Sequence, residues 1–264
     1  MNELGAELIV KPGKKFHLDA IDPDDTHGID KATAEKRLDK DRVDLLELQS
    51  VLYAEARRAV LIVLQGIDAS GKDGTIRHVM SGLNPQGVTV TSFKVPEGDE
   101  KRHDYLWRIH RAVPEWGKIG IFNRSHYEDV LVVRVHNIVP KEVWRKRFDQ
   151  INDFERMLTE CGVRILKFFL LISKDEQAKR FQERLDDKTK TWKFSADDTK
   201  ERKFWDEYQR AYQDVLTKCS TEAAPWYVIP ANHKWFRNLA VAHIVRDEMQ
   251  AMKLKYPEPA GGNA

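Results

Sequence analysis

The chain has 264 residues, which is long enough for one sizeable α/β domain. Hydrophobic residues make up 41% and charged residues 33%, as in an ordinary globular protein. The net charge of +2 excludes a strongly basic or acidic protein, so only local charge clusters can indicate a partner. Cys161 and Cys219 lie far apart, which argues against a zinc site or a disulfide framework. Because the sequence has neither a signal-peptide pattern nor the run of about 18 apolar residues that a membrane span needs, we expect a cytoplasmic protein without membrane contact.

The first 58 residues divide into an arm and a helix. Residues 1–30 are rich in Pro, Gly and Asp and have no hydrophobic periodicity, so we expect an extended arm that packs on the main body. From Asp30 to Arg58 the pattern is helical, with Leu38, Leu45 and Leu52 near one face among charged residues.

Five apolar runs, most of them rich in β-branched residues, predict the strands of one sheet. They are residues 59–65, 88–95, 118–122, 163–172 and 226–229. The first, third and fourth are almost continuously apolar, as expected for parallel strands covered by helices on both faces. Residues 131–139 (LVVRVHNIV) are ambiguous, because their β-branched content favours a strand but so short a run cannot be assigned by pattern alone.

The segments between these runs predict helices. Residues 141–161 place Trp144, Phe148 and Ile151 at three- and four-residue steps, and residues 235–253 predict a closing helix. Ser173 and Ser195 each begin a pattern typical of a helix N-terminus. Strands and helices alternate, which predicts a three-layer α/β/α fold with a five-stranded parallel sheet.

The clearest functional motif is residues 66–75 (GIDASGKDGT), directly after the first predicted strand. Gly66, Gly71 and Lys72 fit the GxxxxGK pattern of a phosphate-binding loop, in which backbone N–H groups and a helix N-terminus converge on an anion. Asp73 replaces the Ser or Thr that usually follows the lysine, which leaves the usual hydroxyl–magnesium contact open at that position. Asp68 either stabilises the turn or holds a metal beside the bound phosphates.

A second motif, residues 119–129 (IGIFNRSHYED), follows the third predicted strand. Polar residues at the carboxyl end of such a strand lie where open α/β sheets bind ligands. Arg124 is suited to clamp phosphate oxygens, and Glu128 and Asp129 are suited to reach a metal or an acceptor. Ser125 and Asp129 fit equally well as caps of the next helix.

Residues 179–203 form a basic, polar stretch between two predicted helices. Arg180 and Arg184 are four residues apart and therefore share one helical face. Lys188, Lys190 and Lys193 follow in a predicted loop. Such a segment either closes over a phosphate site as a lid that excludes water, or forms a solvated helical hairpin.

Together these motifs resemble the polyphosphate kinase 2 family over about residues 30–255. The matching blocks are GIDASGKDGT at 66–75, PEGDEKRHDYLWRIH at 96–110, FNRSHYEDVL at 122–131 and RFQERLDDKTKTWKFSADD at 180–198. The resemblance implies a single P-loop kinase domain over residues 1–264, with residues 1–58 as arm and helix and residues 179–203 as a helical lid. It implies transfer of the terminal phosphate between polyphosphate and AMP, ADP or ATP in either direction, with Mg²⁺ or alternatively Mn²⁺; GMP and GDP are further acceptors to consider.

The resemblance also implies residue roles. Asp68 and Lys72 would be the carboxylate and lysine of the loop, Arg124 would grip the transferred phosphate, and Arg184 would neutralise charge from the lid. Asp68 and Glu128 would hold the metal. The phosphate-binding set would be completed by Gly66, Ala69, Ser70, Gly71, Asp73, Gly74, Thr75, Arg180 and Lys188.

Two positions matter for how the resemblance is interpreted. Asn123 stands where many members have the carboxylate that follows the strand, so Asp68 would carry more of the magnesium. Glu128 stands where members that act mainly on diphosphates have Asn, which favours the subgroup that accepts both AMP and ADP. Family analogy also predicts a homo-oligomer, either a dimer or a tetramer.

Other functions fit parts of the sequence. An ATP-dependent nucleoside or nucleotide kinase would share the loop and the fold. A guanine-nucleotide switch usually carries an Asn-Lys-x-Asp motif, which the sequence lacks. A non-catalytic polyanion-binding protein would bind polyphosphate without transferring phosphate. No nucleic-acid-binding motif accompanies the basic segment, so we expect no nucleic-acid partner.

Overall fold

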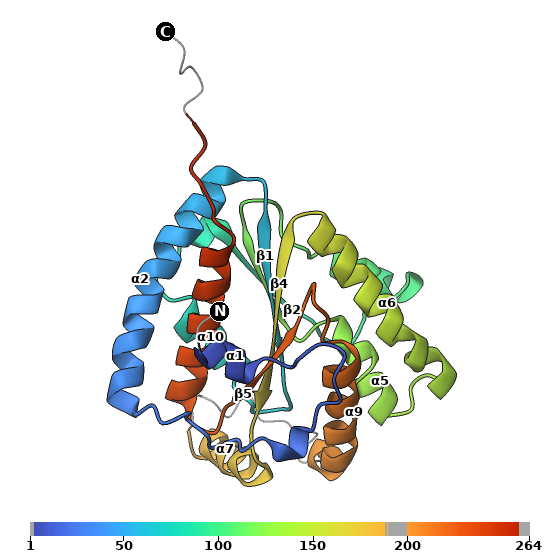
Figure 1. The fold of residues 1–264 in the computed structure, drawn as a ribbon. Coiled ribbons are helices and arrows are strands. Elements are labelled where there is room, and N and C mark those ends of the chain that lie inside the picture. The colour runs from blue at the N-terminus through green and yellow to red at the C-terminus, as the bar shows by residue number, and fades with distance from the viewer. Residues whose placement is uncertain (1–2, 188, 190–199, 259–264) are drawn as a thin grey trace.

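A single parallel sheet organises the chain in the computed structural model, which describes residues 3–187, 189 and 200–258. Its strand order is β2-β3-β1-β4-β5, and every neighbouring pair is parallel (Figure 1). The strands are β1 (Ala59–Gln65), β2 (Val88–Ser92), β3 (Ile119–Asn123), β4 (Val163–Leu171) and β5 (Trp226–Pro230). All five predicted strands are confirmed, with ends that differ by up to three residues.

Helices cover both faces of the sheet, so the fold has the predicted three layers. Along β1, Leu61 and Val63 belong to one apolar core, whereas Val60, Ile62 and Leu64 belong to the other. Burial on both faces explains why this strand is continuously apolar rather than alternating.

One core is covered by α2 (Lys31–Glu55), α3 (Lys72–Val79) and α10 (Lys234–Ala251). The other is covered by α5 (Val132–Val135), α6 (Lys141–Glu160) and α9 (Trp205–Lys218), on the opposite side of the sheet in Figure 1. The short helix α4 (Trp107–His110) also contributes to this second core. The long helices predicted at 30–58, 141–161 and 235–253 are therefore confirmed.

The ambiguous run at 131–139 is helical in the structure. Leu131 and Val135 are both buried one turn apart, on the side of α5 that packs into the core. Arg134 Nη1 donates to Asp214 Oδ2 of α9 at 2.6 Å.

The N-terminal arm packs on the main body, as predicted, and does so along β5; it contains a short helix, α1 (Glu3–Leu8), where the sequence predicted an extended segment. Ile9 forms an antiparallel bridge with Tyr227, and Val10 N donates to Trp226 O at 2.8 Å. Farther along the arm, Pro23 O accepts a hydrogen bond from Asn232 N. The arm therefore covers the β5 edge of the sheet.

Helix α7 (Lys174–Asp186) begins where the sequence predicts, because Ser173 Oγ accepts a hydrogen bond from Glu176 N at 3.1 Å. The predicted cap at Ser195 and the basic residues Lys188, Lys190 and Lys193 lie outside the described residues. Within the part of the chain that is described, we find no helix both long and apolar enough to cross a lipid bilayer.

Candidate active site

The two sequence motifs meet at the carboxyl edge of the sheet. Residues 66–71 connect the central strand β1 to α3, whose N-cap Gly71 has a left-handed backbone (φ 103°). The second motif follows the adjacent strand β3, where Asn123 pairs with Leu64 of β1. Arg124 N then donates to Leu64 O at 3.1 Å, which fixes the start of the second motif beside the loop.

An ion pair joins the loops. Arg124 Nη2 donates to Asp68 Oδ1 at 2.8 Å, and both side chains are partly exposed. Arg124 and Ala69 both have positive φ, 62° and 63°, which is uncommon for residues other than glycine and is typical of functional sites. Gln177 of α7 donates to Asp68 O at 3.0 Å and holds the same loop from the other side.

Lys72 lies folded into the loop. Its Nζ donates to Gly66 O at 2.6 Å and Ile67 O at 3.3 Å, and the residue is 9% exposed. Burial, followed by the charge of Arg124, lowers the pKa of Lys72 to about 8, although the nearby carboxylates oppose this shift. An anionic phosphate in the loop would replace carbonyl partners by charged ones and favour the protonated lysine.

The two unusual residues at Asp73 and Asn123 are partners. Asn123 Nδ2 donates to Asp73 Oδ1 at 2.8 Å, so an amide at 123 meets the carboxylate that replaces the usual hydroxyl of the loop. A carboxylate at both positions would place two like charges together. Thr75, the next hydroxyl along the loop, is buried, and its Oγ1 donates to Gly71 O at 3.1 Å.

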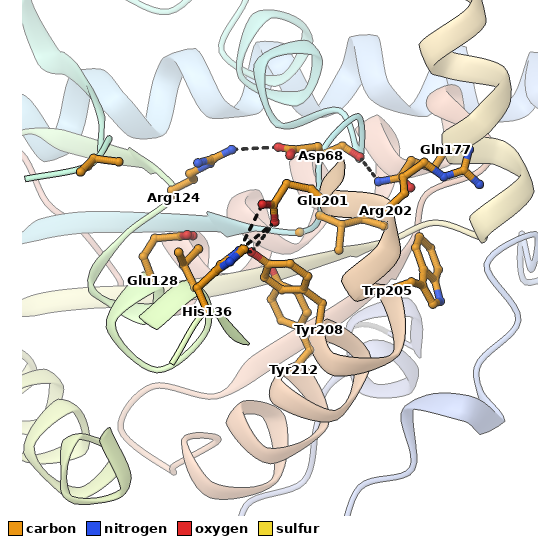
Figure 2. A pocket seen from close by; sticks show the side chains of 14 residues that line it. Asp68, Arg124, Glu128, His136, Gln177, Glu201, Arg202, Trp205, Tyr208 and Tyr212 are labelled. Carbon is orange, nitrogen blue, oxygen red and sulfur yellow. Dashed lines mark hydrogen bonds and ion pairs between the residues drawn. The ribbon is translucent and has the colours of Figure 1, made fainter. Parts of the chain in front are cut away.

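A cavity of about 350 Å³ opens beside the Asp68–Arg124 pair (Figure 2). Glu128 lies in its wall, and its carboxylate forms no hydrogen bond or ion pair with another described residue, whereas its backbone N donates to Ser125 O at 3.1 Å. The remaining lining residues are Gly66, Ile67, Val95, Val132, His136, Gln177, Glu201, Arg202, Trp205, Tyr208 and Tyr212.

Ser125 caps the short 3-10 helix His126–Asp129, as its alternative interpretation predicts, whereas Asp129 is not a cap and forms an ion pair instead. Ser125 Oγ accepts a hydrogen bond from Tyr127 N at 3.2 Å. Asp129 Oδ1 accepts one from Arg147 Nη1 at 2.8 Å, and burial raises the pKa of Asp129. Neither residue lines the cavity.

One wall of the cavity consists of residues that the sequence did not single out, although Glu201 and Arg202 fall within the predicted lid segment 179–203. Glu201 Oε2 accepts a hydrogen bond from Tyr208 Oη at 3.0 Å and lies 3.1 Å from His136 Nε2, which links α9 to the residue that follows α5. Tyr212 lies one turn further along α9, and burial followed by the charge of Glu128 raises its pKa well above the ordinary value. For the two tyrosines the sequence offers a four-residue spacing, which is equally typical of core residues.

The predicted cations of α7 lie outside the cavity. Arg180 is 5% exposed and donates to the carbonyl oxygens of Ala69, Ser70, Ala231 and Asn232, so it supports the loop from behind. Arg184 lies over the ring of Phe181, 5.5 Å from its centroid, and does not line the cavity in this conformation. Lys188 is outside the described residues.

The cavity carries donors that suit magnesium. Among residues 3–187, 189 and 200–258 no cluster of three or more His, Cys, Asp or Glu side chains is placed to hold a metal. Mg²⁺ does not require one, because it commonly binds one or two carboxylates and takes its other ligands from substrate phosphates and water. Asp68 and Glu128 in one cavity fit that pattern.

Comparison with known proteins agrees with this geometry. The family model described as "Polyphosphate kinase 2 (PPK2)" matches residues 28–257. The AMP/ADP-polyphosphate phosphotransferase of Meiothermus ruber is 53% identical over 252 residues, which are 95% of this chain and 94% of the relative. The ADP-polyphosphate phosphotransferase of Rhodopseudomonas palustris is 50% identical over 226 residues, 81% of this chain and 78% of the relative.

The fold comparison gives the same result. The crystal structure of polyphosphate kinase 2 from Arthrobacter aurescens superposes with a TM-score of 0.94 at 43% identity, covering 98% of this chain and 93% of the other. With its loop, its parallel sheet and these relatives, the chain belongs to the polyphosphate kinase 2 family and is a phosphotransferase.

Proposed function

We propose that this enzyme transfers the terminal phosphate of inorganic polyphosphate to both AMP and ADP, and that the transfer is reversible. Two relatives of almost equal identity have different acceptors in their names, AMP/ADP for one and ADP for the other. Overall similarity therefore does not choose between the acceptors. The observation that supports AMP as well as ADP is the carboxylate of Glu128 in the cavity beside Asp68 and Arg124.

The chemistry requires positioning and neutralisation of charge, since phosphoryl transfer needs little covalent help from the protein. Lys72 and the N–H groups of residues 69–73 would bind phosphate oxygens, and Arg124 would turn from Asp68 to the transferred group. Mg²⁺ held by Asp68 and Glu128 would supply further positive charge between the polyphosphate and the nucleotide phosphate. No strong general base is needed, because a nucleotide phosphate is already an anionic nucleophile.

Glu128 favours AMP for a simple reason of ligand number. ADP offers two phosphate groups to a metal, whereas AMP offers only one. A carboxylate in the cavity would supply the oxygen ligand that the missing β-phosphate cannot. A neutral amide at that position would leave the metal dependent on the β-phosphate of ADP.

We expect Glu128→Gln to lower kcat/KM for AMP at least roughly tenfold more than kcat/KM for ADP. With ADP the β-phosphate can replace the lost carboxylate as a metal ligand, whereas AMP has no second phosphate to do so. The measurement is initial rates with polyphosphate, Mg²⁺ and either AMP, ADP or GDP. Glu201→Gln is the matched control, since its carboxylate already bonds to Tyr208 and His136 and its loss should leave the AMP/ADP ratio unchanged. An equal loss for both acceptors in Glu128→Gln would contradict this role.

The remaining expectations about the enzyme's setting stay predictions. They are the cytoplasmic location, the use of Mg²⁺ or alternatively Mn²⁺, the formation of ATP and the assembly into dimers or tetramers. An ATP-dependent nucleotide kinase remains the alternative activity for the same loop, and the choice of donor distinguishes the two.

A further inference from the structure

Arg237, which belongs to none of the sequence motifs, lies directly against the phosphate-binding loop. It is in the first turn of α10 and is 3% exposed. A Cβ atom built on Gly71 would lie 1.9 Å from Arg237 Nη1, and one built on Gly74 would lie 3.2 Å from Nη2. Glycine at both positions therefore makes room for this guanidinium under the start of α3.

The charge of Arg237 has no anionic partner among the described residues. Its Nε and Nη2 donate to Asn238 Oδ1 at 3.2 and 2.8 Å, and Nη1 lies 3.5 Å from Ser70 O. Arg180, buried nearby, differs in this respect. Arg180 Nε donates to Glu176 Oε1 at 2.7 Å, and the rest of its guanidinium reaches four carbonyl oxygens.

This position is costly for a cation. Burial, followed by repulsion from Arg180, lowers the pKa of Arg237 to about 9, yet an arginine side chain remains charged in proteins. Arg237 also lies at the N-terminal turns of α10 and α3, where the helix dipole favours anions over cations. A buried charge without a partner destabilises a fold, so a retained one points to a compensating role when a ligand binds.

We propose that Arg237 is a positioning residue whose unpaired charge is compensated by the phosphate anion that the loop binds. Its charge strengthens the positive potential of the loop from below, while its guanidinium packs under Gly71 and Gly74 and sets the backbone that meets the phosphate. In the free protein the buried charge of Arg237 is therefore destabilising, and a phosphate bound in the loop reduces this destabilisation. This inference rests on the proposed use of the loop for polyphosphate.

The test compares the purified full chain with its Arg237→Met variant, using tripolyphosphate with Mg²⁺ as the probe. Met keeps an apolar stem and removes the charge, so the melting temperature without ligand should be unchanged or higher. The affinity for tripolyphosphate should fall roughly tenfold, and the ligand-induced rise in melting temperature should shrink accordingly. Arg237→Lys, which restores a charge, should recover most of the affinity.

Two controls separate this role from a purely structural one. Arg180→Met removes partners from four carbonyl oxygens and should lower the melting temperature without ligand. Lys179→Met removes an exposed cation, so any effect on tripolyphosphate affinity should vanish at high salt, whereas the effect of Arg237→Met should persist because a buried charge is poorly screened.

Each result has a definite meaning. If the wild type binds tripolyphosphate and Arg237→Met binds it equally well, the inference about Arg237 is wrong and the proposed function stands. If Arg237→Met is markedly less stable without ligand, the arginine stabilises the fold itself and the inference is again wrong. A wild type that tripolyphosphate does not stabilise overturns both the inference and the proposed function.

Discussion

Lys72→Met should lower kcat for phosphate transfer by roughly 10²- to 10³-fold, the usual cost of removing one preorganised group that stabilises transition-state charge. Lys72 lies at the centre of the loop, and its Nζ now donates to Gly66 O and Ile67 O. Methionine fills a similar volume, so the loss should come from the missing charge rather than from a cavity. Single-turnover rates with polyphosphate, ADP and Mg²⁺ measure it.

The control for this variant is Lys40→Met, which changes the same residue type on the exposed side of α2. It should keep the wild-type rate. Both variants should have melting temperatures close to that of the wild type. A Lys72→Met enzyme with an unchanged rate would contradict the assignment of residues 66–75 as the phosphate-binding loop.

Lys167→Met should lower the free energy of unfolding by about 3–5 kcal/mol, because it leaves a buried carboxylate without its cation. Lys167 is 0% exposed, and its Nζ donates to Glu155 Oε2 at 2.5 Å, Cys219 O at 2.6 Å and Tyr127 Oη at 2.9 Å. His126 Nε2 lies 3.2 Å from the other oxygen of Glu155. Thermal unfolding should show a melting temperature roughly 10 °C lower.

A second variant tests whether the unpaired carboxylate of Glu155 causes this loss of stability. The double variant Lys167→Met with Glu155→Gln removes both charges and should recover part of the lost stability. Lys118→Met, which breaks the exposed pair with Glu115, should leave the melting temperature nearly unchanged. A double variant as unstable as the sum of its single variants would show that the two charges do not act on each other.

The same pair predicts a dependence on pH. Burial tends to raise the pKa of Glu155, but Lys167 and His126 outweigh it, so the folded-state pKa lies below the ordinary value of 4.5. A carboxylate with a depressed pKa stabilises the fold above its unfolded pKa and loses that contribution as the pH falls through the folded value. The stability difference between wild type and Lys167→Met should therefore shrink below pH 4.5.

Local patterns in the sequence predicted most of the fold. The strand before Gly66 is continuously apolar because helices cover both faces of the sheet, and Ser173 caps α7 as its spacing indicates. The run at 131–139 could not be decided, because its helix packs Val135 into the core and pairs Arg134 with Asp214 of the distant helix α9. Such contacts between distant segments are information that no window of residues contains.

The candidate site could likewise be predicted only in part. The contact of Asp68 with Arg124 follows from two motifs at neighbouring strand ends, and the sequence placed them at one edge. The partnership of Asp73 with Asn123 and the burial of Arg180 depend on side-chain directions across the fold. Arg237 gave no signal at all, since its significance lies in having no carboxylate partner among the residues that the structure describes.

The most direct test of the central claim is ³¹P NMR of the purified enzyme with Mg²⁺, ADP and polyphosphate and with no nucleoside triphosphate added. Transfer predicts that the β-phosphate resonance of ATP grows while polyphosphate is consumed, and that ATP added to polyphosphate gives ADP in the reverse direction. An enzyme that leaves polyphosphate unchanged in both directions, yet phosphorylates nucleotides from ATP, would contradict the claim.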